Sequence, residues 1–388
     1  MKVGLESIDF YTSHYYLDLK DIAENRDIPV SKYYVGIGQE KMATPPPDED
    51  VVTLAANAVY AALRNIDKQK IDTVMFSTES GIDQSKAAGI YIHHLLELDS
   101  HCRVFELKQA CYSGAAAIQM AVPYIMANPD RKILIVASDI ARYGLGAAGE
   151  PTQGAGAVAM VLSAEPRILA FHPESGLFTE DVMDFWRPNF RDEALVDGKF
   201  SVKMYIKALL ESWQQYSSIS GRQYQDIAKF CYHLPFTKMG EKAHMQLAKQ
   251  YAGNDFPEEA VHAQIADSLV YNRIVGNTYT ASLFLALLSM LENTPDDLSG
   301  KNVGLFSYGS GCVGEFFSGE VLPGYKQYLH GQEHSQFLAD RQALNYQEYS
   351  DFYSGFIKNG ENLELPRHQT GRFRLAGIEN HKRIYQAL

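Results

Sequence analysis

The sequence has few cysteines and no long apolar run, and these absences exclude several classes of protein. The longest apolar stretch, residues 279–291, is shorter than the roughly 18 residues that a membrane-spanning helix needs. The N-terminus also lacks the apolar core of a signal peptide. No Cys-x-x-Cys pair is present, so neither a disulfide framework nor a metal site is indicated, and the scattered free thiols favour a reducing, cytoplasmic location. The four scattered thiols are Cys102, Cys111, Cys231 and Cys312.

Positive charge is also scarce. The 388 residues contain 47 acidic and 35 basic side chains, a formal net charge of -12, and no basic block. Such a chain binds nucleic acid and anionic membranes poorly, so an anionic ligand must be held by a local patch. Hydrophobic residues make up 46% and charged residues 21%, which is typical of a folded globular protein of two to three domain-equivalents.

Short apolar, β-rich runs alternate with helical patterns, and this order predicts an α/β layered fold. The predicted strands of the first part are residues 72–78, 103–107, 132–138 and 157–163, and the helices between them are residues 85–98 and 113–127. The plan then repeats with a strand at 228–236, a small-residue helix at 277–293 and two closing strands at 302–311 and 313–322.

The repeat predicts two similar halves, residues 1–165 and 166–325. They are followed by a C-terminal extension, residues 326–388, which we expect to be helical. An aromatic, turn-rich segment at residues 179–205 lies between the halves, and segments of this kind often line a site.

Two stretches match the pattern G-x-G-x-x-G, at residues 144–149 and 309–314. Both follow a predicted strand, but neither opens a helix, because the first runs into Pro151 and the second into an aromatic-rich strand. A pyrophosphate therefore has no helix N-terminus to bind, and a nicotinamide-dependent oxidoreductase is disfavoured.

Cys111 lies between a predicted strand and a helix of unusually small residues. One interpretation is a buried cysteine that acts as a small hydrophobe. The other is a nucleophile, because a helix N-terminus favours the thiolate and the small neighbours leave room for a substrate. Position alone does not decide between them.

Glu79 follows a predicted strand, and His233 interrupts the apolar run of the predicted strand at 228–236, in the corresponding place of the second half. Taken singly, the first is more often a solvated loop residue and the second a satisfied core histidine. If the halves are symmetric, both side chains come together over Cys111, and a thiol with a base and an acid is the arrangement used in covalent acyl chemistry.

These residues and their surroundings resemble a known family, the 3-hydroxy-3-methylglutaryl-CoA synthases of the thiolase superfamily, in their bacterial form. The resemblance covers nearly the whole chain. It is carried by VGIGQEKMA, STESGIDQSKAA, ACYSGAAA, DIARYGLGAAGEPTQGAGAVAM, DVMDFWRP, LVDGKFS, HLPFTKMG, GNTYTASL and LFSYGSGCVGEF. It implies a five-layered αβαβα thiolase-like fold, a homodimer, and an acyltransferase of the mevalonate pathway to isoprenoids.

The resemblance also assigns roles. Cys111 would take the acetyl group of acetyl-CoA, Glu79 would remove a proton from the acetyl methyl, and His233 would position acetoacetyl-CoA and assist its ketone oxygen. CoA thioesters are substrates here, with no cofactor, nucleic acid or membrane as partner. Residues matching positions that contact the acyl portion are Tyr143, Thr152, Ser201, Asn277 and Ser310. Lys238 and Lys242 match positions beside the CoA phosphates or pantetheine.

Two other classes of condensing enzyme are compared with this sequence through the residues that they would need. A thiolase would use a second cysteine as its base, but Cys312 follows the glycines of its turn instead of preceding them. A ketoacyl synthase would pair the nucleophile with His and Asn, and His233 and Asn277 are both present. Glu79 separates the synthase from this alternative. A non-catalytic acyl-CoA-binding relative is disfavoured because all three reactive side chains are present.

Overall fold

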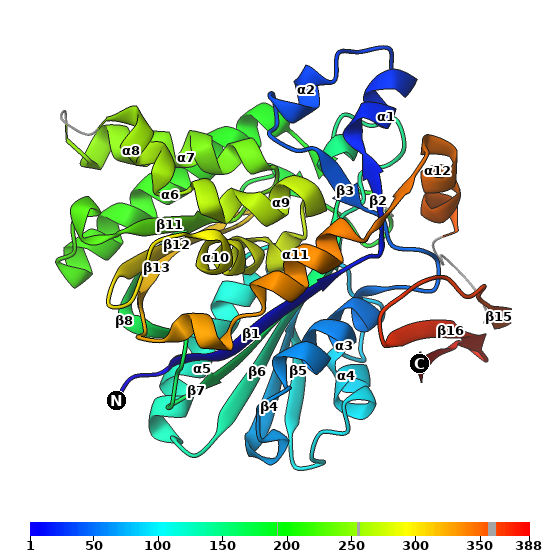
Figure 1. Cartoon of the computed structure of the whole chain (residues 1–388), viewed down its shortest axis with the longest axis horizontal. Coiled ribbons are helices and arrows are strands. Elements are labelled where there is room, and N and C mark those ends of the chain that lie inside the picture. The colour runs from blue at the N-terminus through cyan, green and yellow to red at the C-terminus, as the bar shows by residue number, and fades with distance from the viewer. Residues whose placement is uncertain (192, 254–256, 356–361) are drawn as a thin grey trace.

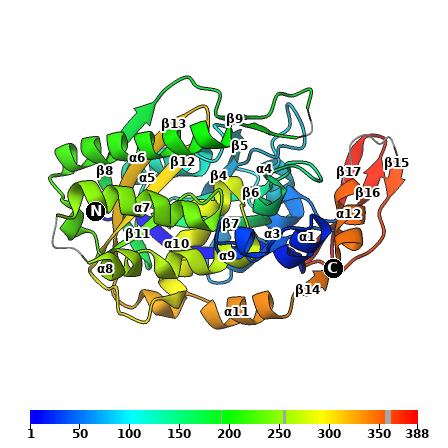
Figure 2. The ribbon, with the colours of Figure 1, turned by 90° about the horizontal axis from the view of Figure 1, so that it is seen from above.

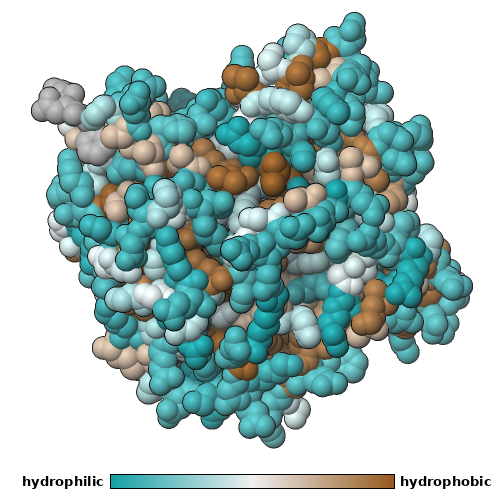
Figure 3. Space-filling view, viewed as in Figure 1, coloured by the Kyte–Doolittle hydropathy of each residue, from teal (hydrophilic) through white to brown (hydrophobic). Residues whose placement is uncertain are grey.

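The structure, a computed structural model, describes residues 1–191, 193–253, 257–355 and 362–388. None of the helices in these ranges is long and apolar enough to cross a membrane. The face shown in Figure 3 is mostly hydrophilic, with its apolar atoms in small separate areas.

Nine strands form one continuous sheet in the order β11-β12-β13-β8-β1-β7-β6-β4-β5. Its two ends repeat one pattern, because β4 and β6 pair in parallel as β11 and β12 do, while β7 and β13 are antiparallel to both of their neighbours. The strands are β1 (Gly4–Thr12), β4 (Ile71–Ser77), β5 (Arg103–Leu107), β6 (Lys132–Ile140), β7 (Ala155–Ser163), β8 (Leu169–Thr179), β11 (Lys229–Tyr232), β12 (Asn302–Gly309) and β13 (Val313–Val321).

Helices cover both faces of each half of this sheet. Helices α3 (Val51–Ala62) and α4 (Gly89–Leu95) pack outside the first half, and α6 (Gly198–Ser220) and α7 (Thr237–Tyr251) outside the second. Two helices, α5 (Ser113–Ala127) and α10 (Ser282–Asn293), pack on the inner faces (Figures 1 and 2). The five-layered αβαβα prediction is therefore confirmed.

The small residues of α5 have a packing reason. A Cβ added at Gly114 would lie 2.5 Å from the ring of Phe284 on α10, so a larger residue there would push the two inner helices apart. Strands β6 and β7, which carry the apolar runs, are buried along their whole length on both faces, as the sequence predicts.

Helix α6 was not predicted, and it begins inside the segment expected to be an excursion. Asp197 caps it by accepting the N–H of Phe200. The first part of the segment forms a small hairpin of β9 (Phe185–Trp186) and β10 (Leu195–Val196). The predicted helix at 85–98 is limited to α4.

The segment after residue 325 is a mixture of helices and strands, which corrects the prediction of a helical extension. Helices α11 (Gly331–Ala339) and α12 (Tyr346–Ser354) are separated by β14 (Gln342–Leu344). Strand β14 joins β2 (Tyr15–Asp18) and β3 (Lys41–Ala43), beside helices α1 (Leu19–Asn25) and α2 (Ser31–Tyr34). A three-stranded sheet of β15 (Asn362–Glu364), β16 (Phe373–Glu379) and β17 (Lys382–Ala387) ends the chain.

A buried ionic cluster attaches α11 to the rest of the molecule. His334 on α11 contacts Asp9 on β1 through Nε2 at 2.9 Å and Glu292 on α10 through Nδ1 at 2.9 Å. Figure 1 shows α11 lying across the front of β1. Burial disfavours a charged ring, but the hydrogen bonds to both carboxylates outweigh it and raise the pKa of His334 to about 9.

This cluster predicts a pH-dependent stability. A histidine whose pKa is about 9 in the folded chain and about 6.5 in the unfolded chain stabilises the fold by about 3 kcal/mol below pH 6.5. This contribution is lost as the pH rises through 9. The melting temperature of His334→Gln should therefore lie well below that of the unaltered protein at pH 6.5, with the difference closing by pH 10.

The control is His172→Gln, because the ring of His172 faces the amide oxygen of Asn302 instead of a carboxylate. Its melting curve should show no such convergence with pH. A constant difference for His334→Gln over the whole range would contradict the assignment.

Candidate active site

Cys111 and Glu79 are in direct contact. Glu79 follows the carboxyl end of β4, and Cys111 precedes the first turn of α5. The thiol of Cys111 donates to Oε1 of Glu79 at 2.6 Å. Burial, together with the nearby Asp139 carboxylate, raises the pKa of Glu79 to about 8.

The thiol itself is not acidic in this state. Burial and the Glu79 carboxylate raise the pKa of Cys111 well above its usual value, although the N–H of the same residue opposes this. The lowering expected from a helix N-terminus is therefore outweighed, and Cys111 is a protonated thiol whose proton acceptor is already in place.

Asp139 fixes the turn that carries Glu79. This fully buried residue near the end of β6 accepts through Oδ1 from the hydroxyl of Thr78 and from the N–H groups of Glu79 and Ser80, all at 2.8 to 2.9 Å. Its Oδ2 accepts from the N–H and hydroxyl of Thr280, at 3.0 and 2.5 Å. Thr280 lies two residues before α10, so one carboxylate joins the two halves beneath Glu79.

Three aromatic rings surround the sulfur. Phe185, Tyr143 and Tyr279 stand edge to face, with ring centroids 5.8 to 6.3 Å apart, and they pack with Cys111 and Ala141. The guanidinium of Arg187 donates to the backbone carbonyl of Glu79. The segment at 179–205 thus contributes to the site, as predicted.

His233 follows β11, as Glu79 follows β4, and it is buried and uncharged. Burial lowers the pKa of His233 to about 3. Its Nδ1 has no hydrogen-bond partner among the residues that the structure describes. The ring of Tyr205 lies 6.5 Å from the His233 ring, and burial and the proximity of Cys111 raise the pKa of Tyr205. Tyr205 therefore lies near both His233 and the nucleophile.

The predicted acyl-contacting residues are not all directed at the sulfur. The three rings of Phe185, Tyr143 and Tyr279 are called the aromatic wall below. The hydroxyl of Tyr143 is within reach of Thr152 and Tyr279. Oδ1 of Asn277 accepts the N–H of Tyr279 at 2.8 Å, which supports the same wall. Ser201 instead donates to Asp184 at 3.0 Å.

The backbone N–H groups of the turn at Gly309–Gly311 form a candidate binding site for the negatively charged oxygen of a reacting thioester. Contacts within the protein already use part of this turn. The N–H of Gly311 donates to Asp184 Oδ1 at 2.9 Å, and the hydroxyl of Tyr308 donates to Oδ2 of the same carboxylate. The carbonyl of Ser310 accepts from Gln109 at 3.4 Å. The N–H of Cys111 is thus the better candidate donor for a thioester oxygen.

The two lysines lie on α7, which starts soon after His233. Lys238 forms an ion pair with Glu241, and Lys242 lies over the ring of Phe236, with its Nζ 5.3 Å from the centroid. The N–H of Lys238 also donates to the carbonyl of Ile37, so α7 begins against the segment that carries the VGIG motif.

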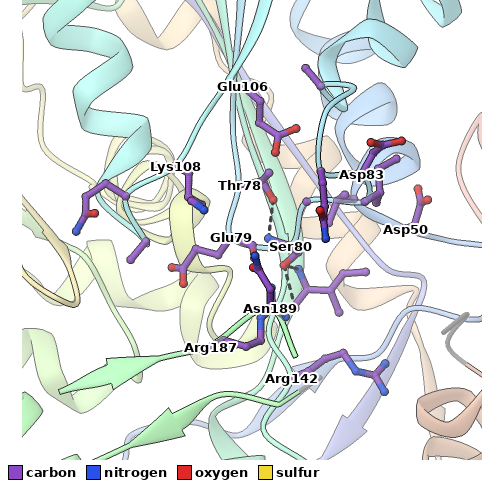
Figure 4. A pocket seen from close by; sticks show the side chains of 18 of the residues that line it. Asp50, Thr78, Glu79, Ser80, Asp83, Glu106, Lys108, Arg142, Arg187 and Asn189 are labelled. Carbon is purple, nitrogen blue, oxygen red and sulfur yellow. Dashed lines mark hydrogen bonds between the residues drawn. The ribbon is translucent and has the colours of Figure 1, made fainter. Parts of the chain in front are cut away.

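A cavity of 1310 Å³ reaches Glu79 from the side of β5. Of the ten predicted site residues, only Glu79 and Ser310 line it. Lys108, Glu79 and Arg187 lie together on one side of this cavity, and Asp83 and Asp50 lie on the other (Figure 4). Because Cys111 and His233 are absent from its lining, the cavity is not by itself the substrate channel.

Sequence reasoning missed Asp139, Arg187, Tyr279 and Tyr205 as site residues. Asp139 had a usable signal, because it follows the predicted strand 132–138 just as Glu79 follows the predicted strand 72–78. Arg187 and Tyr279 lie inside quoted motifs, but nothing in their spacing directs them toward Cys111. Tyr205 lies on the unpredicted helix α6.

Two similar α/β halves that share one sheet, with a buried thiol and carboxyl in direct contact, are typical of a thiolase-like acyl-transferring enzyme. Comparison with known families narrows this class. The family model "Hydroxymethylglutaryl-coenzyme A synthase N terminal" matches residues 1–166, and its C-terminal counterpart matches residues 170–263 and 254–351.

Individual relatives agree with the family models. The hydroxymethylglutaryl-CoA synthase of Enterococcus faecalis is 41% identical over 386 residues and covers 100% of both chains. The polyketide 3-hydroxy-3-methylglutaryl-ACP synthase of Bacillus subtilis is 33% identical over 94% of this chain and 92% of its own. A crystal structure of an HMG-CoA synthase complexed with CoA is 39% identical and superposes with a TM-score of 0.95, covering 100% of both chains.

The chain belongs to the hydroxymethylglutaryl-CoA synthase family, which confirms the predicted family and its class of acyl-condensing transferase. Membership of this family excludes the two alternatives of a thiolase and a nicotinamide-dependent oxidoreductase. The role of each site residue stays a prediction.

The Asp139 contacts predict a change in the pH profile of condensation. A base must be deprotonated, so the rate should rise with pH through the pKa of Glu79, which is about 8. Asp139→Asn removes a negative charge that raises this pKa, so the midpoint should move to lower pH. The maximum rate should also fall about 10²-fold, because the NH2 group of asparagine replaces one acceptor oxygen and faces the donors of either the Glu79 turn or Thr280. An unshifted midpoint would contradict the electrostatic role.

Proposed function

We propose that this chain condenses acetyl-CoA with acetoacetyl-CoA and water, giving 3-hydroxy-3-methylglutaryl-CoA and CoA through an acetyl-Cys111 intermediate. The observation that carries the proposal is the buried thiol–carboxyl contact of 2.6 Å between Cys111 and Glu79. A thiol with a raised pKa reacts only if a base removes its proton as it attacks, and Glu79 is in that position.

In the first step the sulfur of Cys111 attacks the acetyl carbonyl carbon. The new C–S bond forms as the bond to the CoA sulfur breaks, and Glu79 receives the thiol proton, which leaves with CoA. The N–H of Cys111 stabilises the developing negative charge on the carbonyl oxygen.

In the second step Glu79 removes a proton from the methyl group of the acetyl thioester. The resulting carbon attacks the ketone of acetoacetyl-CoA, and a C–C bond forms while the ketone oxygen becomes an alkoxide. The proton that Glu79 took from the methyl group is returned to this oxygen, which gives the 3-hydroxyl group and regenerates the base. His233 is neutral because burial keeps its pKa near 3, so it assists as a hydrogen-bond donor rather than as an imidazolium. Water then hydrolyses the Cys111 thioester, which releases the product and makes the sequence irreversible.

The binding of CoA is proposed from charge. An acidic chain needs local cations for an anionic substrate, and Lys238 and Lys242 lie on one helix that starts beside His233. We assign them to the phosphates or pantetheine of CoA. Replacing both with Ala should raise the KM for the CoA substrates, and unchanged KM values would refute this assignment.

We also propose a cytoplasmic homodimer that needs no cofactor, made of halves 1–165 and 166–325 and the extension 326–388. The repeated strand order supports the division. Strand β5 ends the sheet without a second neighbour, and apolar side chains of Ile82, Ile90 and Phe105 line the cavity beside it, so a second copy would cover both. Sedimentation equilibrium should then give twice the chain mass of 43.4 kDa.

The covalent step is tested by intact-protein mass after mixing with acetyl-CoA. The unaltered chain should gain one acetyl group, Cys111→Ala should gain none, and acetoacetyl-CoA should remove the adduct as product forms. Glu79→Gln should still acetylate, while its condensation rate should fall about 10²- to 10⁴-fold because it has no base for the methyl proton.

Glu106→Gln is the matched control, because Glu106 also lines the cavity beside β5 but its carboxylate accepts the N–H of Ala88. It should acetylate and condense normally. No adduct on the unaltered chain would overturn the covalent mechanism, and normal turnover by Glu79→Gln would remove Glu79 from it.

A further inference from the structure

The loop between β6 and β7 brings Tyr143 to the nucleophile, and it is held from outside by the C-terminal extension. Tyr143 packs with Cys111, Phe185 and Tyr279. The loop also contains Thr152, which the hydroxyl of Tyr143 can reach. Where this loop sits therefore decides how closely the aromatic wall surrounds the sulfur.

Gln153 connects this loop to α12. Its Oε1 accepts the backbone N–H of Tyr143 at 2.8 Å, and its Nε2 donates to the hydroxyl of Tyr349 at 2.8 Å. The side chains of Gln153 and Tyr349 are buried, with exposed fractions of 4% and 2%. These two hydrogen bonds connect the hydroxyl of Tyr349 through one side chain to the backbone of Tyr143, so the position of Tyr349 affects that of Tyr143.

Further contacts hold α12 and the loop in register. The guanidinium of Arg142 lies 3.8 Å from the ring centroid of Tyr353 and donates to its carbonyl at 2.8 Å. On the other side of the loop, buried Glu150 accepts the N–H of Gly146 at 2.9 Å and forms an ion pair with Arg26, which follows α1.

The backbone of Gln153 is fixed as well. Gln39, which comes just before β3, donates through Nε2 to the carbonyls of Pro151 and Gln153 at 3.0 and 3.2 Å. The relay from Tyr349 through Gln153 to Tyr143 therefore starts and ends on restrained backbone. Because both ends are restrained, a displacement of Tyr349 shifts the backbone of Tyr143. In a less restrained arrangement, side-chain rotation would take up the displacement.

We propose that Tyr349 and Gln153 are positioning residues, which keep the aromatic wall closed over Cys111 so that the acetyl thioester meets acetoacetyl-CoA before it meets water. This inference rests on the proposed function, because it concerns the lifetime of the acetyl-Cys111 intermediate. Neither residue touches the reacting atoms. Their effect is on the partition of the intermediate between condensation and premature hydrolysis.

The experiment measures that partition. Each protein is mixed with acetyl-CoA alone, and hydrolysis is followed by CoA release while intact mass reports the acetylated fraction. Condensation is then measured with acetoacetyl-CoA. Tyr349→Phe removes the hydrogen bond to Gln153 and the contact of the hydroxyl with Glu150 on the same loop, so the ratio of hydrolysis to condensation should rise about tenfold or more. The acetylated fraction at early times should match that of the unaltered chain.

A second variant, Gln153→Met, keeps the side-chain volume and removes both hydrogen bonds of the relay. Its ratio should rise at least as much. Because the two residues act through one relay, the double variant should be no worse than Gln153→Met alone. If Gln153→Met does not fold, the comparison of Tyr349→Phe with the unaltered chain still tests the positioning role.

The matched control is Tyr216→Phe. The hydroxyl of Tyr216, on α6, is also buried and pairs with Ser318 at 2.7 Å, but it is remote from the loop. It should lower the melting temperature without changing the ratio. An unchanged ratio in Tyr349→Phe, or an equal change in Tyr216→Phe, would overturn the inference. Absence of an adduct on the unaltered chain would instead overturn the proposed function.

Discussion

The site depends on one buried carboxylate, that of Asp139. It accepts hydrogen bonds from the turn that carries Glu79 and from Thr280, which precedes the inner helix of the other half. A carboxylate with zero exposure is tolerated only when donors surround it, so the two halves must meet in one register to supply them. The same negative charge raises the pKa of Glu79, so the junction of the halves and the basicity of Glu79 are linked.

Burial then sets the protonation state of each reactive group. It raises the pKa of Glu79 to about 8 and lowers the pKa of His233 to about 3, so each moves toward its neutral form. The thiol of Cys111 is likewise neutral and donates to Glu79. In the proposed reaction this burial suits the generation of a carbon nucleophile, because a carboxylate in a poorly hydrated site is a stronger base once it has lost its proton.

The C-terminal extension contributes to this arrangement although it lies outside the two halves. Helix α11 is fixed by His334 between Asp9 and Glu292, which belong to different halves. Helix α12 meets the loop of Tyr143 through Gln153. The extension therefore supports the two halves: α11 contacts β1 of the central sheet, and α12 contacts the loop that carries Tyr143. Neither contact can be predicted from the local sequence pattern of residues 326–388.

The sequence by itself determined the strand and helix order of both halves, because apolar runs and small-residue helices are local signals. It also predicted Cys111, Glu79 and His233 as site residues, from the position of Glu79 after a strand, of Cys111 before a helix and of His233 within an apolar run, and their roles stay predictions. Only the tertiary structure decided that Asp139, Arg187, Tyr279 and Tyr205 join them, and that Ser201 turns toward Asp184 instead. The pKa direction of Cys111 also needed the fold, because burial and a carboxylate far away in sequence outweigh the local helix N-terminus. Hydrogen bonds between distant segments and the desolvation of charged groups depend on packing in three dimensions, and local periodicity carries no record of either.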